Sequence, residues 1–183
     1  MAKLTYGERK ALPGSVFAVD GKKRKYPLTD IAYLAGIIDG EGSIFIERDF
    51  ALRPNQKSIG YFPRIVISNT DYRLMEWLEE NFGGNITKTK RNGNWKDSYT
   101  WNISHYKAIK LARLVMPYLK LKGVQSYILN CFDYEVLWTK GGKPEDAKVS
   151  DEELERREEL YQECKYFNRR ETRNGTEITN FAS

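Results

Sequence analysis

The feature that most constrains this chain is the segment Tyr33–Ser43, Y-L-A-G-I-I-D-G-E-G-S, in which an apolar helix ends in two carboxylates set among glycines. Small residues recur at every fourth position, at Ala32, Gly36 and Gly40, so they share one helix face where a second helix backbone can approach closely. Glu41 follows directly. If two copies pack through this face, two glutamates arrive side by side, and such a pair is costly unless a cation lies with it. The segment therefore predicts a metal site built at an interface.

A bare pattern of small residues would equally suit an amphipathic core helix with an acidic, glycine-rich exit turn. The whole run Leu34–Gly42, L-A-G-I-I-D-G-E-G, resembles the signature of the LAGLIDADG homing endonucleases. The small residues, the apolar pair and the terminal acid and glycine all match. The departure is Glu41, where the family's name has aspartate. Both acids are hard oxygen ligands suited to Mg²⁺.

Length and composition are typical of a nucleic-acid enzyme without proving one. The chain has 183 residues, a formal charge of +5 and a pI of about 9.1, which suits a polyanionic partner but also an ordinary basic protein. Cys131 and Cys164 lie too far apart for a disulfide framework or a zinc knuckle. The single histidine, His105, argues against hydrolases that need several imidazoles, and we expect it at a strand end or on the surface.

No apolar stretch is long enough to cross a bilayer, and the N-terminus has no signal-peptide apolar region. We therefore expect an intracellular protein that has no membrane partner and is not secreted. The resemblance implies the cytoplasm of a prokaryote or an organelle.

Periodicity and turn residues predict the elements in chain order. Thr29 is expected to cap a helix from about Asp30 to Asp39 that Gly40 and Gly42 end. The elements expected after it are strands at 43–48 and 61–68 joined by a loop at 53–56, and a helix that is capped by Thr70 and Asp71, runs through Asn81 and is ended by Gly83 and Gly84. They are followed by a hairpin at 85–104 around a turn at 92–94, helices at 106–119 and 124–139, a loop at 141–144, and a charged helix from the capping box at 150–153 to about Arg170.

This order predicts an α+β fold in which four strands form one antiparallel sheet with helices on one face. The resemblance implies an αββαββα, LAGLIDADG homing endonuclease-like architecture with a saddle-shaped sheet. We expect residues 29–140 to form the endonuclease core. Residues 1–28 form a basic arm containing the run 22–25, which is solvated or follows phosphates. Residues 141–183 add a loop and a charged helix that either braces the core or extends the nucleic-acid contact.

The uncovered face of the sheet is expected to be the working face. In the last strand, polar Ser98, Thr100, Asn102 and Ser104 alternate with residues suited to a core, such as Trp101. A solvated sheet face would explain any one strand equally well, and only the combination with basic charge and the motif favours DNA. The predicted DNA-binding residues are Ser43, Phe45, Glu47, Arg64, Ser68, Asn85, Thr87, Thr89, Arg91, Lys96, Thr100 and Asn102.

The resemblance extends to two further segments. The run Pro117–Lys122, P-Y-L-K-L-K, is similar to the segment that brings a lysine to the active site in homodimeric members, and Lys122 is the matching residue. Asn69 stands at the strand-to-helix junction where the family often has glutamine, and Arg73 matches the associated arginine. Without the resemblance, Lys122 would be a helix-end cation near the last carbonyls and Arg73 a surface arginine.

The resemblance implies a catalytic set of Glu41, Lys122, Asn69 and Arg73. Glu41 and the Gly40 carbonyl would hold Mg²⁺, Mn²⁺ would substitute for it, and Ca²⁺ would bind without supporting efficient cleavage. Asp39 would support the helix end.

The chain carries one copy of the motif, so it supplies half a site and is expected to form a homodimer. The interface residues expected are Ala32, Ala35, Gly36, Asp39 and Gly40. The resemblance implies cleavage of long pseudo-palindromic double-stranded DNA with short 3′ overhangs. Two alternatives remain open: an intron maturase or other non-cleaving DNA- or RNA-binding protein of the same fold, for which intron RNA is a partner, and a structural dimer with no affinity for DNA at moderate salt.

Overall fold

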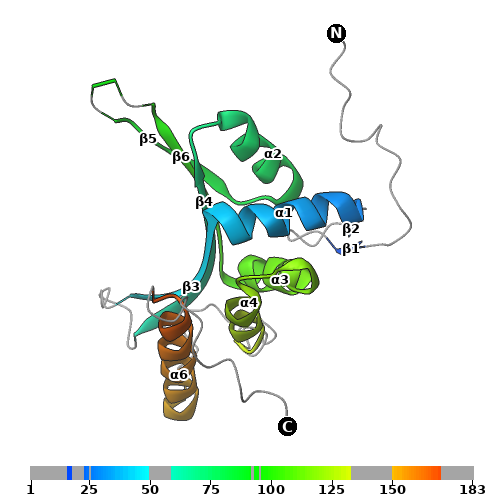
Figure 1. Ribbon diagram of the computed structural model, residues 1–183. Helices are drawn as coiled ribbons and strands as arrows, with labels where there is room; N and C mark the ends of the chain where they lie inside the picture. Colours follow the sequence, from blue (N-terminus) through cyan, green and yellow to red (C-terminus); the bar gives the residue numbers. More distant parts are fainter. Residues whose placement is uncertain are drawn as a thin grey trace.

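The computed structural model describes residues 16–17, 23–24, 26–49, 59–91, 93–94, 96–132 and 150–169 (Figure 1). Several predicted features lie wholly or partly outside these residues, namely the basic run at 22–25, the loop at 53–56, the hairpin turn at 92–94, the helix end at 133–139 and the loop at 141–144.

The described elements follow the predicted order of helix, hairpin, helix, hairpin and further helices. Their bounds are α1 Leu28–Glu41, β3 Gly42–Asp49, β4 Gly60–Asn69, α2 Tyr72–Phe82, β5 Asn85–Thr89, β6 Ser98–Ser104, α3 His105–Val115, the 3₁₀ turn η2 Met116–Tyr118, α4 Gly123–Asn130 and α6 Asp151–Phe167. Before them, β1 (Val16–Phe17) pairs with β2 (Lys23–Arg24), which the sequence did not predict.

The four longer strands form one antiparallel sheet in the order β3-β4-β6-β5. The helices lie on one side of this sheet (Figure 1), and the strand residues that face them are buried, including Ile44, Ile65 and Trp101. The alternating residues on the other side remain partly or fully exposed. The predicted α+β fold, with a four-stranded antiparallel sheet covered on one face, is confirmed.

Helix α1 lies against the centre of the sheet because its apolar residues share one face. Ile31, Leu34, Ala35 and Ile38 are spaced three or four positions apart, and all four are buried. The helix contacts β3 and β4 on one side of the core and α3 and η2 on the other. This packing fixes the position of the acidic end of the motif segment.

Both ends of α1 differ from the prediction. The helix begins at Leu28 after Pro27, which has no side-chain cap bond, so Thr29 lies inside the first turn and is not the cap. At the other end the helix continues through Gly40 to Glu41 and stops at Gly42, whose N–H donates to the Ile38 carbonyl. A Cβ at Gly42 would lie 2.8 Å from the Ile38 Cα, so this close turn requires glycine.

The later helices also have different bounds. The helix expected at 106–119 is α3, which ends at Val115, and the chain then makes the 3₁₀ turn that contains Pro117. The helix expected at 124–139 is α4, which ends at Asn130.

None of the described helices is long and apolar enough to span a bilayer.

Helix α6 begins at the predicted cap, where Ser150 Oγ accepts a hydrogen bond from the Glu153 N–H, and it packs on β3 and α4. Glu158 joins it to the sheet. Its Oε1 accepts from Arg48 Nη1 at 2.9 Å, and its Oε2 accepts from the Tyr61 hydroxyl at 2.5 Å. Arg48 and Tyr61 are directly paired across β3 and β4, so one carboxylate holds both strands.

The Tyr61 hydroxyl predicts a loss of stability at alkaline pH. Burial first, and then the hydrogen bond to Glu158, raise the pKa of Tyr61 from 10.0 to about 12. Since the unfolded tyrosine ionises at the lower pH, the contribution of Tyr61 to the free energy of unfolding is complete below pH 10 and is lost as the pH rises through 12. Burial also raises the pKa of the Cys164 thiol to about 12, so it adds to the same loss.

Urea unfolding between pH 9 and 12, on the native protein and on Tyr61→Phe, measures the tyrosine's share. We expect the stability of the variant to decline less steeply over this range. Equal slopes for the two proteins would contradict the assignment.

Candidate active site

The exposed face of α1 carries three of the five residues predicted for an interface. Ala32, Gly36 and Gly40 are exposed, and a Cβ built at either glycine would meet no atom within 4 Å. The prediction for Ala35 is wrong, because this residue lies in the chain's own core with 0% exposure. The periodicity that puts Ala32 and Gly36 outside turns Ala35 inward with Ile31 and Ile38. The face remaining for a second helix is therefore narrow and smooth.

Glu41 is exposed at the carboxyl end of this face, and the exposed Gly40 precedes it. Gly42, the next residue, pairs with Ile67 across β3 and β4. Glu41 comes directly before Gly42 in the chain, and Ser68 and Asn69 come directly after Ile67 at the end of β4. The junction of α1 with the sheet thus brings Glu41 close to the end of β4.

Lys122 lies at the same end of α1. Its side chain is 4% exposed, and Nζ donates hydrogen bonds to the carbonyl oxygens of Ile38 at 2.8 Å and Asp39 at 2.5 Å. These carbonyls belong to the last turn of the helix, where a cation is favoured. The contacts are those of a helix-end cation. The two carbonyl groups that bind the ammonium group belong to residues two and three positions before Glu41 in the sequence. A role as a helix-end cation is therefore compatible with the predicted role as a lysine of the active site.

Asp39 completes a reciprocal arrangement with the segment after η2. Its Oδ2 accepts from the Lys120 N–H at 2.7 Å, and its Oδ1 accepts from the Lys122 N–H at 3.0 Å. Asp39 therefore directs its carboxylate to its own chain, although it was predicted at the interface. It holds the backbone of residues 120–122 while Lys122 holds the end of α1.

Asn69 and Arg73 flank the start of α2. Asn69 Oδ1 accepts from the Asp71 N–H at 2.9 Å. The Arg73 guanidinium donates to both Asp71 oxygens, at 3.0 and 2.6 Å, and the Arg73 side chain is 88% exposed. The hydrogen bonds from the side chain and backbone N–H of Arg73 lower the pKa of Asp71 to about 2. Asn69 is the last residue of β4, whereas the Arg73 side chain is directed to Asp71.

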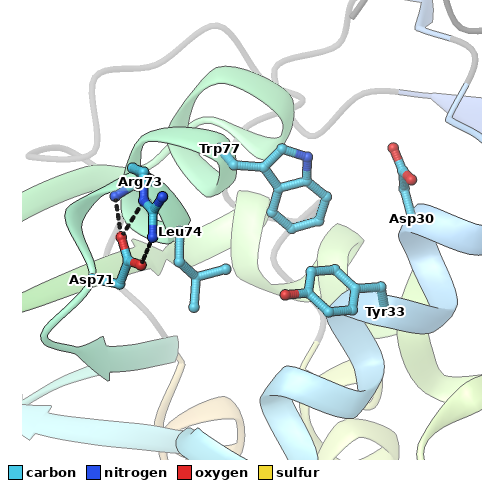
Figure 2. A pocket seen from close by; sticks show the side chains of 6 residues that line it. All are labelled: Asp30, Tyr33, Asp71, Arg73, Leu74 and Trp77. Atoms are coloured by element: carbon cyan, nitrogen blue, oxygen red, sulfur yellow. Dashed lines mark hydrogen bonds and ion pairs between the residues drawn. The ribbon is translucent and has the colours of Figure 1, made fainter.

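A pocket of about 450 Å³ opens between α1 and α2 (Figure 2). Tyr33 and Trp77 meet there edge to face, with ring centroids 5.4 Å apart. Its lining residues are Asp30, Tyr33, Asp71, Arg73, Leu74 and Trp77. Glu41 and Lys122 are not among them, so this pocket is separate from the carboxylate end of α1.

The predicted DNA-binding residues of the four strands lie on one face of the sheet. The register aligns Phe45 with Arg64, and Ser68 with Thr100 and Thr87, all on the side opposite the helices. The same alternation places Ser43, Glu47, Asn85, Thr89 and Asn102 on this side, while Arg91 and Lys96 are exposed beyond the ends of β5 and β6. We call the strand residues of this side the open face.

Two contacts between side chains order the open face. Arg64 pairs with Glu47 at 2.7 Å, and Ser68 Oγ lies 3.0 Å from Thr100 Oγ1.

His105 borders the open face, and it was not among the predicted DNA-binding residues. It begins α3 with φ +59°, its ring lies 5.0 Å from the Phe62 ring, and its Nδ1 is 2.8 Å from Ser104 Oγ. Burial, and then the positive charge of Arg64, lower the pKa of His105, while Glu47 opposes that change. The expected place at a strand end is confirmed. The only available signal was its position directly after the polar alternation of β6.

The donor atoms at the end of α1 fit a hard cation, but one chain offers few of them. Within the described part of the chain, no group of three or more histidine, cysteine, aspartate or glutamate side chains could hold a metal ion. Glu41 supplies a carboxylate and Gly40 a backbone carbonyl, which are the oxygen ligands that Mg²⁺ and Ca²⁺ prefer.

Comparisons with known proteins agree with this geometry. The family model described as LAGLIDADG endonuclease matches residues 34–134. Among solved structures, the chain is similar to the homing endonuclease I-CvuI in complex with its target and Ca (17% identity, TM-score 0.60, covering 83% of this chain and 87% of that one). It is also similar to an archaeal intron-encoded homing endonuclease, I-Vdi141I, complexed with DNA (16%, 0.58, 83% and 89%).

A third structure, the I-SmaMI LAGLIDADG homing endonuclease bound to cleaved DNA, is 16% identical with a TM-score of 0.53, and the match covers 75% of this chain but 44% of that one. At these identities the structures show a shared fold. None of the curated proteins compared with the chain matches it.

Proposed function

This chain belongs to the LAGLIDADG endonuclease family, and from that premise we propose that it is a site-specific homing endonuclease acting as a homodimer. Two copies would cut both strands of a long pseudo-palindromic DNA site in a metal-dependent reaction and leave short 3′ overhangs. The observation that carries this proposal is the exposed Glu41 at the end of the smooth α1 face, with Lys122 bound at the same helix end.

The open side of α1 supports the dimer. Ala32, Gly36 and Gly40 present no side chain beyond a methyl group, so the backbones of two α1 helices can approach closely. A two-fold axis along this contact would bring the two Glu41 side chains together. It would also set the two open faces side by side, which requires a target with matching two-fold symmetry.

The metal site would use Glu41 and the Gly40 carbonyl from each copy. A divalent cation bound there would activate water and neutralise charge on the phosphate. Mg²⁺ is the expected ion, Mn²⁺ would replace it, and Ca²⁺ would bind without efficient cleavage. Structures similar to this chain were determined with Mg and with Ca, which is consistent with a divalent ion.

The surrounding residues would orient the phosphate and the water. Lys122 would stabilise the charge that develops on the phosphate, since its ammonium group lies at the end of α1 that carries Glu41. Asn69 would position water from the end of β4. Arg73 would reach the phosphate after its guanidinium leaves Asp71, which the 88% exposure of its side chain permits.

The open face would lie along the major groove and read the half-site. Short polar side chains such as Ser68, Thr100 and Asn102 suit base edges, and Arg64 suits guanine or phosphate. Arg91 and Lys96, at the hairpin end, would contact the backbone. Residues 29–140 would thus form the catalytic core. The family membership favours the cytoplasm of a prokaryote or an organelle as the compartment in which the protein would work.

The experiment that tests this function exposes the purified protein to a randomised double-stranded DNA library with Mg²⁺ and sequences the cut ends. We expect one long, nearly symmetric site. Selective retention of DNA or structured RNA without any cutting would refute the nuclease and favour the maturase or binding protein of the same fold.

Lys122→Met separates a catalytic lysine from a purely structural one. The variant removes both hydrogen bonds from Nζ, so we expect the free energy of unfolding to fall by about 1–3 kcal/mol. We also expect the single-turnover cleavage rate to fall by about 100-fold. Lys120→Met is the control, because that side chain is exposed and the Asp39 contact uses only the Lys120 backbone. Lower stability with an unchanged rate would leave Lys122 as a helix-end cation only.

A further inference from the structure

Helix α6 is attached to the outer end of the β3–β4 hairpin, close to its last pair, Asp49 and Gly60. The Glu158 carboxylate binds Arg48 of one strand and Tyr61 of the other. The Arg48 guanidinium also lies over the Tyr61 and Tyr161 rings, 6.0 and 5.7 Å from their centroids. Two aromatic rings, a guanidinium and a carboxylate therefore join this end of the hairpin to the middle of α6.

The carboxyl end of α6 binds the same hairpin nearer its base. Cys164 is 1% exposed, and Asn168 Nδ2, just beyond the helix, donates to the Ile44 carbonyl at 2.9 Å. Strand β3 is an edge of the sheet, and this bond satisfies one of its carbonyls. Helix α6 thus follows β3 from its base to its outer end.

The residues that α6 holds alternate with residues of the open face. Arg48 and Tyr61 point toward the helices, while their neighbours Glu47 and Phe62 point the other way. Any displacement of Arg48 or Tyr61 therefore moves the open-face side chains on either side of them. Glu47, the residue before Arg48, forms an ion pair with Arg64 on the open face.

The outer surface of α6 is not suited to touching DNA. Its exposed charges are mainly negative, at Asp151, Glu152, Glu155, Glu159 and Glu163, against Arg156 and Lys165. A phosphate backbone would be repelled by such a surface. The helix also lies on the side of the sheet opposite the open face.

We propose that α6 is a brace, and that Glu158 is a positioning residue which fixes the outer β3–β4 hairpin and so sets the alignment of the open face on DNA without contacting DNA itself. The part that concerns DNA rests on the proposed function. The attachment of the hairpin does not, so the two can fail separately.

The test compares Glu158→Gln, Tyr61→Phe and the double variant with the control Glu159→Gln, which makes the same charge change at an exposed neighbouring position. Backbone amide exchange in the free protein reports on the attachment. We expect exchange within residues 46–49 and 60–62 to rise about 10-fold in Glu158→Gln and to remain unchanged in Glu159→Gln. The double variant should change exchange by less than the sum of the two single changes, because the two substitutions share the contact between Tyr61 and Glu158.

DNA binding is then measured on the selected site and on a scrambled duplex, with Ca²⁺ in place of Mg²⁺. We expect Glu158→Gln to weaken binding to the selected site about 5- to 10-fold, with no change for the scrambled duplex or in the salt dependence. The brace is refuted if exchange does not change, if both duplexes weaken equally, or if Glu159→Gln tightens binding and alters the salt dependence. If the protein selects no DNA, the proposed function fails and amide exchange alone decides whether α6 holds the hairpin.

Discussion

Glu41→Gln is expected to lower the rate of DNA cleavage by about a thousandfold or more. The substitution keeps the size of the side chain and removes its charge, so the site loses the ligand that both copies are proposed to contribute. The residue is exposed at the end of α1, and we expect the free energy of unfolding to change by less than about 0.5 kcal/mol. Affinity for the selected site in Ca²⁺ should stay within about threefold, because the open face is untouched.

The matched control is Glu76→Gln, which makes the same charge change at an exposed position of α2. It should cleave like the native protein. Single-turnover cleavage of the selected site measures both rates, and anisotropy of labelled DNA measures both affinities. A Glu41→Gln protein that cleaves normally would place the metal site elsewhere.

Gly36→Leu is expected to give a folded, monomeric and inactive protein. A Cβ at Gly36 would meet no atom within 4 Å, so a larger side chain would leave the helix into open space. Leucine also has the higher helix propensity, and we expect the free energy of unfolding to stay the same or rise by up to about 1 kcal/mol. A second α1 could no longer approach, so sedimentation should show the monomer and cleavage should fall by about 100-fold or more.

Glu76→Leu controls for the added apolar surface, because it places leucine at an exposed position on α2. It should remain dimeric and active. The small-residue face would lose its assigned role if Gly36→Leu were still dimeric and cleaved DNA at the native rate.

Local patterns predicted the fold well, because burial in the central parts of the strands alternates with the pleat and burial in the helices follows the helical repeat. The alternation around Trp101 in β6 and the spacing of Leu34 and Ile38 in α1 each required one buried face, and the structure has both. The polar side of the sheet followed from the same rule. Ala35 belongs to the motif, but its helical phase places it on the buried face with Ile31 and Ile38, so its predicted place at the interface was wrong.

The remaining differences depend on contacts between distant segments. The end of α1 is fixed by the close approach of Gly42 to Ile38, which no propensity at Gly40 reveals. Lys122 meets the Ile38 and Asp39 carbonyls across 84 and 83 positions, and Glu158 meets Arg48 across 110. Such pairs are set by how the helices pack, so the sequence alone left the role of α6 open between a brace and a DNA contact.

The central claim, that two Glu41 side chains from two copies form one catalytic site, is tested most directly by mixing native and Glu41→Gln protein. After subunit exchange, double-strand cleavage of limiting DNA is measured at constant total protein. If both copies must carry Glu41, cleavage follows the square of the native fraction, and an equal mixture retains about one quarter of the native yield. An equal mixture that retains about one half, or mixed dimers that nick one strand of the DNA, would show that a single Glu41 is sufficient at a strand, which would contradict the shared site.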